Sequence, residues 1–272
     1  MLKKLWRKLF LSTFQKVSQE ATPQMHGVGL NNQTIGILTT AILCLVFTEY
    51  WGSLSYLVKS LANISLPLSN QLKHWLKIHA HPQWIKTVYW SMVTIVFFLL
   101  VPLVYIRWWL KKPLKDFGWQ WRATRQDILI YITCLLCMLP LVWVVSSSPV
   151  FLAKYPFYQP KPNEVAWERY FVLWQLVYLL QFVAVEFFFR GFILHGIKKQ
   201  LGAYSIWVAM LPYCMIHFGK PLPETLGAIV AGLILGTFSL KNNSIWLGVL
   251  LHYGVAITMD LLALWHKGLL FG

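Results

Sequence analysis

Long apolar stretches separated by short polar segments dominate the chain. A membrane-spanning helix needs about 20 mostly apolar residues, and seven stretches are candidates. They cover residues 35–58, 87–109, 127–150, 170–196, 203–218, 223–240 and 244–265. The fifth and sixth are short and end near Pro212, Pro221 and Pro223. Short or broken helices are tolerated in a membrane only where they pack inside protein or line a cavity. The pattern predicts an all-α, polytopic transmembrane helix bundle with about seven spans.

The first 20 residues have a different pattern, in which apolar and basic residues occupy different faces of one helix. The apolar face holds Leu2, Leu5, Trp6, Leu9 and Phe10, and the basic residues around it are Lys3, Lys4, Arg7 and Lys8. This arrangement is typical of an amphipathic helix that lies in the membrane surface. A signal peptide would need a longer apolar core and a small-residue cleavage site, and the segment has neither.

The composition agrees with a membrane protein, because 57% of the residues are hydrophobic and only 12% are charged. A soluble domain carries about 25% charged residues. The net charge of +15 does not indicate a nucleic-acid partner, because no soluble domain is large enough to present a basic face. Anionic lipid headgroups are the partners that such charges favour. The sequence gives no indication of oligomeric state.

The distribution of basic residues predicts the orientation. Lys and Arg collect in cytoplasmic loops, and a cytoplasmic N-terminus places most of the 24 basic residues on that side. The loop from Arg107 to Arg125 contributes most of this bias, and its tryptophans are suited to the membrane interface. We therefore expect an integral membrane protein with its N-terminus in the cytoplasm.

Candidate chemistry is concentrated in the second part of the chain. We expect residues 1–165 to form the surface helix and accessory spans, and residues 166–272 to form a core of catalytic helices. Within its spans from residue 170 onward, the few ionisable residues are Glu186, Arg190, His195, His217, His252 and Asp260, with Glu224 just outside. His195 lies about 180° from Glu186 on an ideal helix, which favours an interfacial position for it. Ionisable residues inside membrane helices are costly and tend to be functional. Side chains on several helices of a bundle can meet at one site in its core.

Glu186 and Arg190 lie four residues apart in an otherwise apolar run. They form either an ion pair that only stabilises the helix or one corner of a site in which Glu186 contacts water or substrate. A buried carboxylate can serve as a general base. His217 stands where a helix breaks at Gly219, which favours a place at the edge of a cavity.

Three further residues are candidates for supporting or completing the site. Glu224 suits the first turn of a helix, where a carboxylate interacts favourably with the helix dipole, and it can also support a site. His252 and Asp260 share one apolar helix, about 12 Å apart along its axis, so they need not touch. The small residues Ala228, Gly232 and Gly236 predict a surface for close helix packing.

The order of these residues resembles the CPBP family of intramembrane proteases, which includes CAAX prenyl endopeptidases and bacteriocin-processing or immunity proteins. The first motif of this family is Glu-Glu-x-x-x-Arg, and here Glu186 and Arg190 match its second Glu and its Arg. Tyr213 and His217 resemble the second motif, an aromatic residue followed four positions later by His. His252 matches the His of the third motif.

Two positions depart from the family pattern. Val185 stands where the first Glu belongs, which makes this a single-Glu variant of the motif. Ala256 stands where the third motif has Asn or Asp, and Asp260, one turn later, is the candidate to substitute for it. The resemblance implies that Glu186 activates a water molecule, with His217 and His252 assisting. It leaves open a zinc ion bound by His217 and His252 together with a carboxylate.

Three functions follow from these residues. The first is an intramembrane endopeptidase that cleaves a membrane-associated protein or peptide. The second is a catalytically silent relative that binds peptides, lipids or proteins as an immunity or scaffold protein. The third is a small transporter that relays protons through buried carboxylates, although no inverted repeat is evident. The resemblance implies a bacterial plasma-membrane protein and does not identify the substrate or whether it is prenylated.

Overall fold

The computed structural model describes residues 10–20, 29–161 and 164–270, and the regular elements of these residues are all helices. The all-α prediction is confirmed. Six helices are long and apolar enough to cross a membrane. They are α3 (Asn32–Trp51), a helix over Pro82–Leu110, α8 (Arg125–Ser146), a helix over Trp167–Leu201, α13 (Leu222–Asn242) and α14 (Trp246–His266). The fifth predicted span is a shorter apolar helix, α12 (Tyr204–Met215).

Two of these long helices contain π-helical turns. The helix over Pro82–Leu110 consists of α6 (Pro82–Ile95), η3 (Val96–Leu100), α7 (Val101–Val104) and η4 (Tyr105–Leu110). The helix over Trp167–Leu201 consists of α10 (Trp167–Glu186), the π-helix η6 (Phe187–His195) and α11 (Gly196–Leu201). π-helical turns widen the backbone locally and are frequent at functional sites. Here the π-helix begins directly after Glu186.

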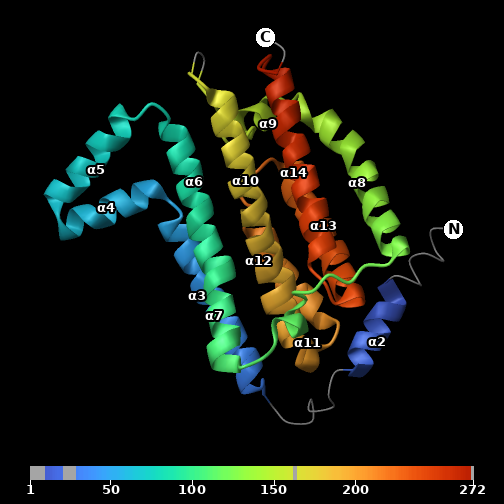
Figure 1. Cartoon of the computed structure of the whole chain (residues 1–272). Helices are drawn as coiled ribbons and strands as arrows, with labels where there is room; N and C mark the ends of the chain where they lie inside the picture. Colours follow the sequence, from blue (N-terminus) through green and yellow to red (C-terminus); the bar gives the residue numbers. More distant parts are fainter. Residues whose placement is uncertain (1–9, 21–28, 162–163, 271–272) are drawn as a thin grey trace.

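The spanning helices form a bundle in which α6, α10, α14 and α8 lie side by side in that order (Figure 1). α12 packs against α13 and η6. The predicted small-residue surface lies at this contact, since a Cβ added at Gly232 would lie 2.7 Å from Met210 Cγ. Gly236 faces Ile206 and Leu194 in the same way, at 3.1 and 3.2 Å. The glycines therefore allow α12 and α13 to approach closely, as expected.

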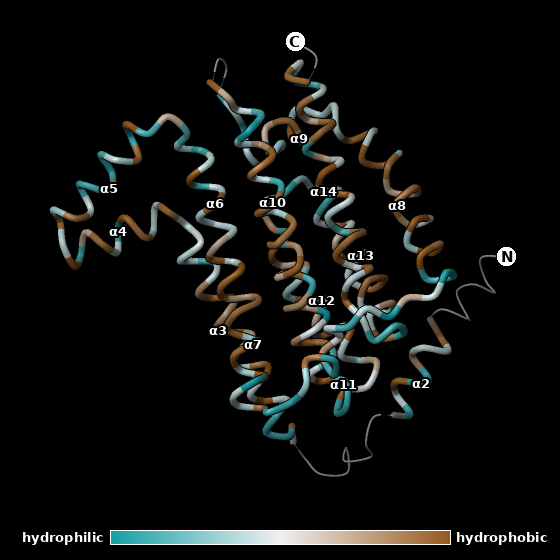
Figure 2. Tube along the Cα trace, in the orientation of Figure 1, coloured by the Kyte–Doolittle hydropathy of each residue, from teal (hydrophilic) through white to brown (hydrophobic). Residues whose placement is uncertain are grey.

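Two amphipathic helices follow the first span and were not expected from the sequence. The predicted span over 35–58 ends at Trp51, and Ser53 then caps α4 (Leu54–Ile64) by accepting from the backbone N–H of Tyr56. Ser65 caps the next helix, α5 (Leu66–Ile78). Both helices extend outward from the bundle, and polar and apolar residues alternate along them (Figure 2).

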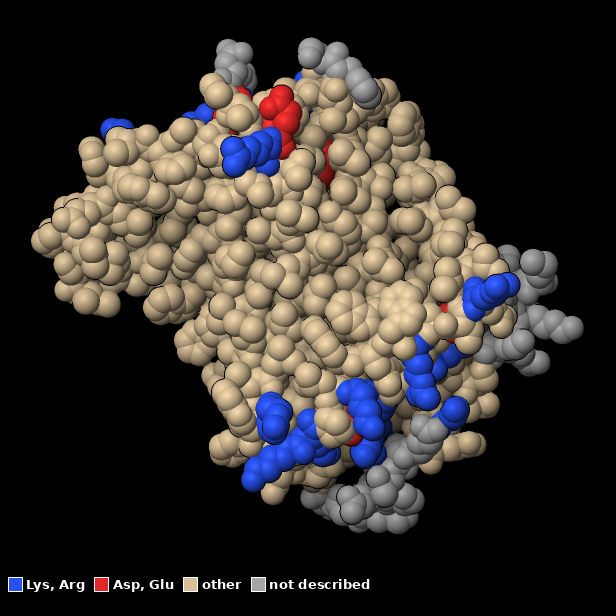
Figure 3. All heavy atoms as spheres, viewed as in Figure 1, with Lys and Arg blue, Asp and Glu red and all other residues tan. Residues whose placement is uncertain are grey.

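The predicted N-terminal surface helix lies largely outside the described residues, because residues 1–9 are not described. The described part of this segment forms α2 (Ser12–Glu20), which lies beside α11 and α13. Phe10 contacts Phe238 on α13, with ring centroids 6.3 Å apart. Basic side chains gather at this end of the molecule, near α11 (Figure 3). Few charged side chains lie on the middle of the bundle on the face that Figure 3 shows.

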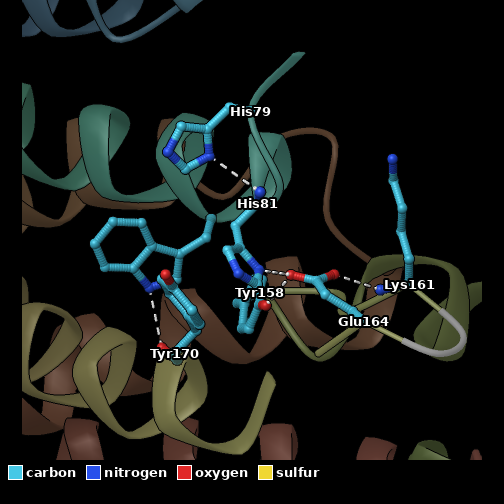
Figure 4. A network of polar contacts seen from close by, with 7 residues as sticks. His79, His81, Tyr158, Lys161, Glu164 and Tyr170 are labelled. Carbon is cyan, nitrogen blue, oxygen red and sulfur yellow. Dashed lines mark hydrogen bonds and ion pairs between the residues drawn. The ribbon is translucent and has the colours of Figure 1, made fainter. Parts of the chain in front are cut away.

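The opposite end is closed by the segment that follows the short helix α9 (Pro149–Lys154). Phe157 inserts between helices and stacks on Trp90 of α6, with ring centroids 5.3 Å apart. A carboxylate then ties the segment to the bundle, because Glu164 accepts from Tyr158 Oη (2.6 Å) and contacts His81 Nδ1 (2.5 Å) (Figure 4). The residues that precede α10 are therefore anchored to the start of α6.

Candidate active site

Glu186 and Arg190 lie at the junction of α10 and η6, in the interior of the bundle. Glu186 is 0% exposed and Arg190 is 2% exposed. Arg190 Nη1 donates a hydrogen bond to Glu186 Oε1 over 3.0 Å. The ion pair that the spacing suggested is present, and it uses one oxygen of the carboxylate.

His252 on α14 contacts the same carboxylate oxygen. Its Nδ1 donates to Glu186 Oε1 over 2.8 Å, and its ring packs on Phe182 with centroids 4.5 Å apart. Gly248, one turn before His252, makes this approach possible, because a Cβ there would lie 2.9 Å from Glu186 Oε2. Gly248 was not predicted from the sequence, although it lies four residues before His252 and residues four apart share one helix face.

Tyr213 on α12 connects the arginine to both histidines. The Arg190 guanidinium carbon lies 3.9 Å above the centre of the Tyr213 ring, a distance suited to a cation–π interaction. Tyr213 Oη lies 3.4 Å from His252 Nε2. The Tyr213 carbonyl oxygen lies 2.8 Å from His217 Nδ1. Tyr213 therefore links His217 of the second motif to Arg190 of the first motif and His252 of the third.

His217 follows the end of α12 and is 6% exposed. Because a carbonyl oxygen can only accept, His217 Nδ1 must carry the hydrogen that it donates to Tyr213. In the neutral ring this leaves Nε2 as an acceptor. Thr225 Oγ1 donates to the His217 carbonyl over 2.9 Å and fixes the turn between α12 and α13. His217 joins the cluster through Tyr213.

Two polar atoms of the cluster are buried without a hydrogen-bond partner in the described part of the chain. They are Glu186 Oε2 and Arg190 Nη2. A buried polar group without a partner costs about 1–3 kcal/mol, so each one needs an explanation. Both atoms belong to the same ion pair, so one acceptor and one donor of the cluster are left to bind a further polar group.

Glu224 and Asp260 take part in other contacts. Glu224 accepts from Tyr155 Oη (2.6 Å) and from Lys220 Nζ (2.7 Å). Asp260 accepts from the Phe157 backbone N–H and from Gln175 Nε2, each over 2.9 Å. Both carboxylates therefore hold the segment after α9 against the bundle, and neither contacts Glu186 or His252.

The two positions that depart from the family motifs are buried among apolar side chains. Val185 is 7% exposed and belongs to the main hydrophobic core. Ala256 is 5% exposed and packs in a second cluster with Phe182 and Trp174. His195, which the sequence favoured as an interfacial residue, is instead buried, and its Nε2 lies 3.0 Å from Ser239 Oγ.

The donor atoms do not fit the zinc site that the sequence left open. The described residues contain no group of three His, Cys, Asp or Glu side chains placed to hold a metal ion. His252 already uses both ring nitrogens, toward Glu186 and Tyr213, and His217 uses Nδ1. Only one histidine nitrogen of the pair remains for a ligand, so we derive no step through a metal.

These observations define a polytopic helical membrane protein with a buried cluster of Glu, Arg, Tyr and two His inside the bundle. The region that contains the cluster, residues 167–258, matches the family described as type II CAAX prenyl endopeptidase Rce1-like. The match covers about a third of the chain and confirms the resemblance to CPBP intramembrane proteases. No curated protein and no solved structure gives a match. The division of the chain at residue 165 stays a prediction.

Proposed function

We propose that this protein is an intramembrane endopeptidase in which Glu186 activates water to cleave a membrane-associated protein or peptide. The observation behind the proposal is the arrangement of the Glu186 carboxylate. Its Oε1 accepts from Arg190 and His252, whereas its Oε2 is buried without a partner among the described residues. A carboxylate held by one oxygen presents the other to a reactant in a fixed direction.

The reaction follows from this geometry. Glu186 Oε2 takes a proton from a water molecule, and the water oxygen attacks the scissile carbonyl carbon. The carbonyl oxygen then becomes negative, and Arg190 Nη2, which has no partner among the described residues, donates to it and stabilises it. The C–N bond breaks as Glu186 returns the proton to the leaving nitrogen, which restores the carboxylate. Water is consumed, and one acid and one amine are formed.

The two histidines have different parts in this scheme. His252 holds the carboxylate in place through Nδ1. His217 presents Nε2 as an acceptor, which suits it to orient the attacking water. Tyr213 positions both rings, and Glu224 and Asp260 support the site only indirectly, through the segment after α9. The proposed steps use no metal, so we expect treatment with a chelator to leave cleavage unchanged.

The test compares peptide termini in membranes of cells that produce the wild type, Glu186→Gln or His217→Ala, using mass spectrometry. Glu168→Gln is a matched control, since Glu168 is exposed on the same helix. We expect new termini in the wild type and the control, and a loss of about 10²–10⁴-fold without the base. Equal termini in all four proteins, or cleavage that a chelator abolishes and zinc restores, would contradict this mechanism.

The competing function is a silent relative that binds peptides, lipids or proteins. The complete burial of Glu186 favours it, because substrate must displace side chains to reach the carboxylate. The same experiment separates the two, since a binding protein yields no new termini in any variant. Purified protein offered one peptide with a prenylated and with a free cysteine then shows whether prenylation matters.

The location belongs to the same proposal. The protein is an integral membrane protein, and we propose that it lies in a bacterial plasma membrane with the basic end of the bundle in the cytoplasm. The clustering of Lys and Arg at one end supports this orientation.

A further inference from the structure

A cavity of about 160 Å³ lies at the basic end of the bundle, apart from the candidate active site. Its lining comes from the start of α3, the loop around η5 (Leu114–Phe117), the end of η6, α11 and the end of α13. The polar residues that matter here are Gln33, Lys112, Asp116, His195, Lys198 and Lys199. His195 lies nine residues after Glu186 on the same long helix.

Lys112 is held at this cavity by a neutral partner. Its Nζ donates to Gln33 Oε1, and Gln33 Nε2 donates to the Gly196 carbonyl over 2.7 Å, which fixes the amide between α3 and α11. Burial lowers the pKa of Lys112, and the charge of Lys199 lowers it further, while Asp116 opposes the shift. The ammonium group therefore lies in surroundings that would favour an added negative charge.

Lys198 is positioned in a similar way. Its Nζ lies 2.7 Å from His195 Nδ1 and donates to Asn243 Oδ1 over 3.0 Å. Because Nδ1 of His195 accepts from an ammonium group, Nε2 carries the ring hydrogen and donates to Ser239 Oγ. His195 is thus a buried acceptor that orients a lysine, which explains a histidine that the active site does not use.

The lining has a positive balance, with three lysines and one aspartate. Lysine binds phosphate as a compact charge, and basic pockets between membrane helices bind anionic lipid headgroups. A water molecule occupies about 30 Å³ in the liquid, so the cavity has room for a phosphate group. We propose that this cavity binds a phosphate group, presented by an anionic lipid headgroup or as the free ion.

The test measures binding through the thermal unfolding temperature of the purified, full-length protein in detergent. The probes are short-chain phosphatidic acid, short-chain phosphatidylcholine and inorganic phosphate. We expect phosphatidic acid to raise the unfolding temperature and phosphatidylcholine to have little effect. Lys112→Gln should weaken the apparent affinity for phosphatidic acid about fivefold, because one basic side chain at an anionic surface contributes about that factor to binding. Lys115→Gln, an exposed lysine of the same loop, is the matched control and should bind as the wild type does.

The possible outcomes of this test either support or overturn the proposed phosphate site. Equal stabilisation by both lipids, or unchanged affinity in Lys112→Gln, overturns the proposal. Inorganic phosphate acting as strongly as phosphatidic acid assigns the cavity to the free ion, and a much weaker effect assigns it to the lipid. If Lys112→Gln unfolds at a lower temperature without ligand, Lys199→Gln repeats the test. Glu186→Gln should bind normally, so failure of the proposed peptidase would leave this result unaffected.

Discussion

Gly248 is the residue that lets the Glu186 carboxylate lie against α14. A Cβ at this position would lie 2.9 Å from Oε2, which is closer than the two atoms can pack. The methyl group of Gly248→Ala would therefore displace Oε2, the oxygen that we assign to activating the water. The hydrogen bonds from Arg190 and His252 are made to the other oxygen, Oε1.

The variant Gly248→Ala should lose cleavage activity by about tenfold to a hundredfold, because displacing a catalytic group by about 1 Å has an effect of that size. Gly254→Ala on the same helix is the control, since its Cβ would meet only Leu135 at an ordinary 3.5 Å. Cleavage rates and unfolding temperatures of both variants check this. Equal activity in the two would show that the position of Oε2 is not critical.

Val185 raises a different question, because the family motif has its first Glu at this position. The side chain lies in the hydrophobic core, where a carboxylate would be buried without a partner. Val185→Glu should therefore lower stability by about 1–3 kcal/mol without raising activity, and Val185→Leu should change neither strongly. Denaturation and cleavage assays on both proteins test this. Higher activity in Val185→Glu would mean that the carboxylate reaches the site after all.

At the scale of elements, the π-helix that begins at Phe187 decides where the side chains in the second half of the helix over Trp167–Leu201 point. A π-helix has a wider turn than an α-helix, so the side chains after Glu186 do not follow the ideal α-helical period. His195 illustrates the effect, because an ideal helix placed it away from the bundle interior and the structure buries it.

The contact between α6 and the segment before α10 should make stability depend on pH. Burial alone raises the pKa of Glu164, but hydrogen bonds from Tyr158, His81 and the Lys161 backbone outweigh it, so the pKa lies below its ordinary value of 4.5. A lowered pKa in the folded state adds stability above the ordinary value, and this stability is lost as the pH falls through the folded value.

We therefore expect Glu164→Gln to lower the unfolding temperature at neutral pH and to flatten its decline in acid. Unfolding curves recorded between about pH 7 and pH 3 for this variant and for Glu168→Gln would check the result. Parallel curves for the wild type and Glu164→Gln would show that the network in Figure 4 contributes no pH dependence.

At the scale of the whole molecule, charge is distributed unevenly between the two ends of the bundle (Figure 3). The α7–α8 loop lies at the basic end, and the segment after α9 lies at the other end (Figure 1). Because basic loops stay in the cytoplasm, the two segments should be on opposite sides of the membrane.

Single cysteines test this orientation in a background in which Cys44, Cys134, Cys137 and Cys214 are replaced by Ser. An impermeant thiol reagent added to intact cells should modify Gln159→Cys, and it should modify Lys115→Cys only after the membrane is opened. The reverse pattern would place the basic end outside the cell.

The sequence by itself determined the helical class, most of the spanning segments and the order of the ionisable residues. These properties are local, because hydrophobic length and composition decide whether a segment can cross a membrane. The two helices α4 and α5 were missed since their amphipathic pattern follows directly after an apolar stretch. The first span was accordingly predicted to end seven residues too late, at residue 58 rather than Trp51.

Only the tertiary structure decided which ionisable groups meet. Glu186 and His252 are 66 positions apart in the chain, and their contact depends on how α10 and α14 cross and on the space left by Gly248. Packing also decides the partners of Asp260, because the Phe157 backbone and Gln175 donate hydrogen bonds to its carboxylate. Spacing along one helix fixes which residues share a face, but the partner of a buried charge comes from whichever neighbouring helix supplies the donor.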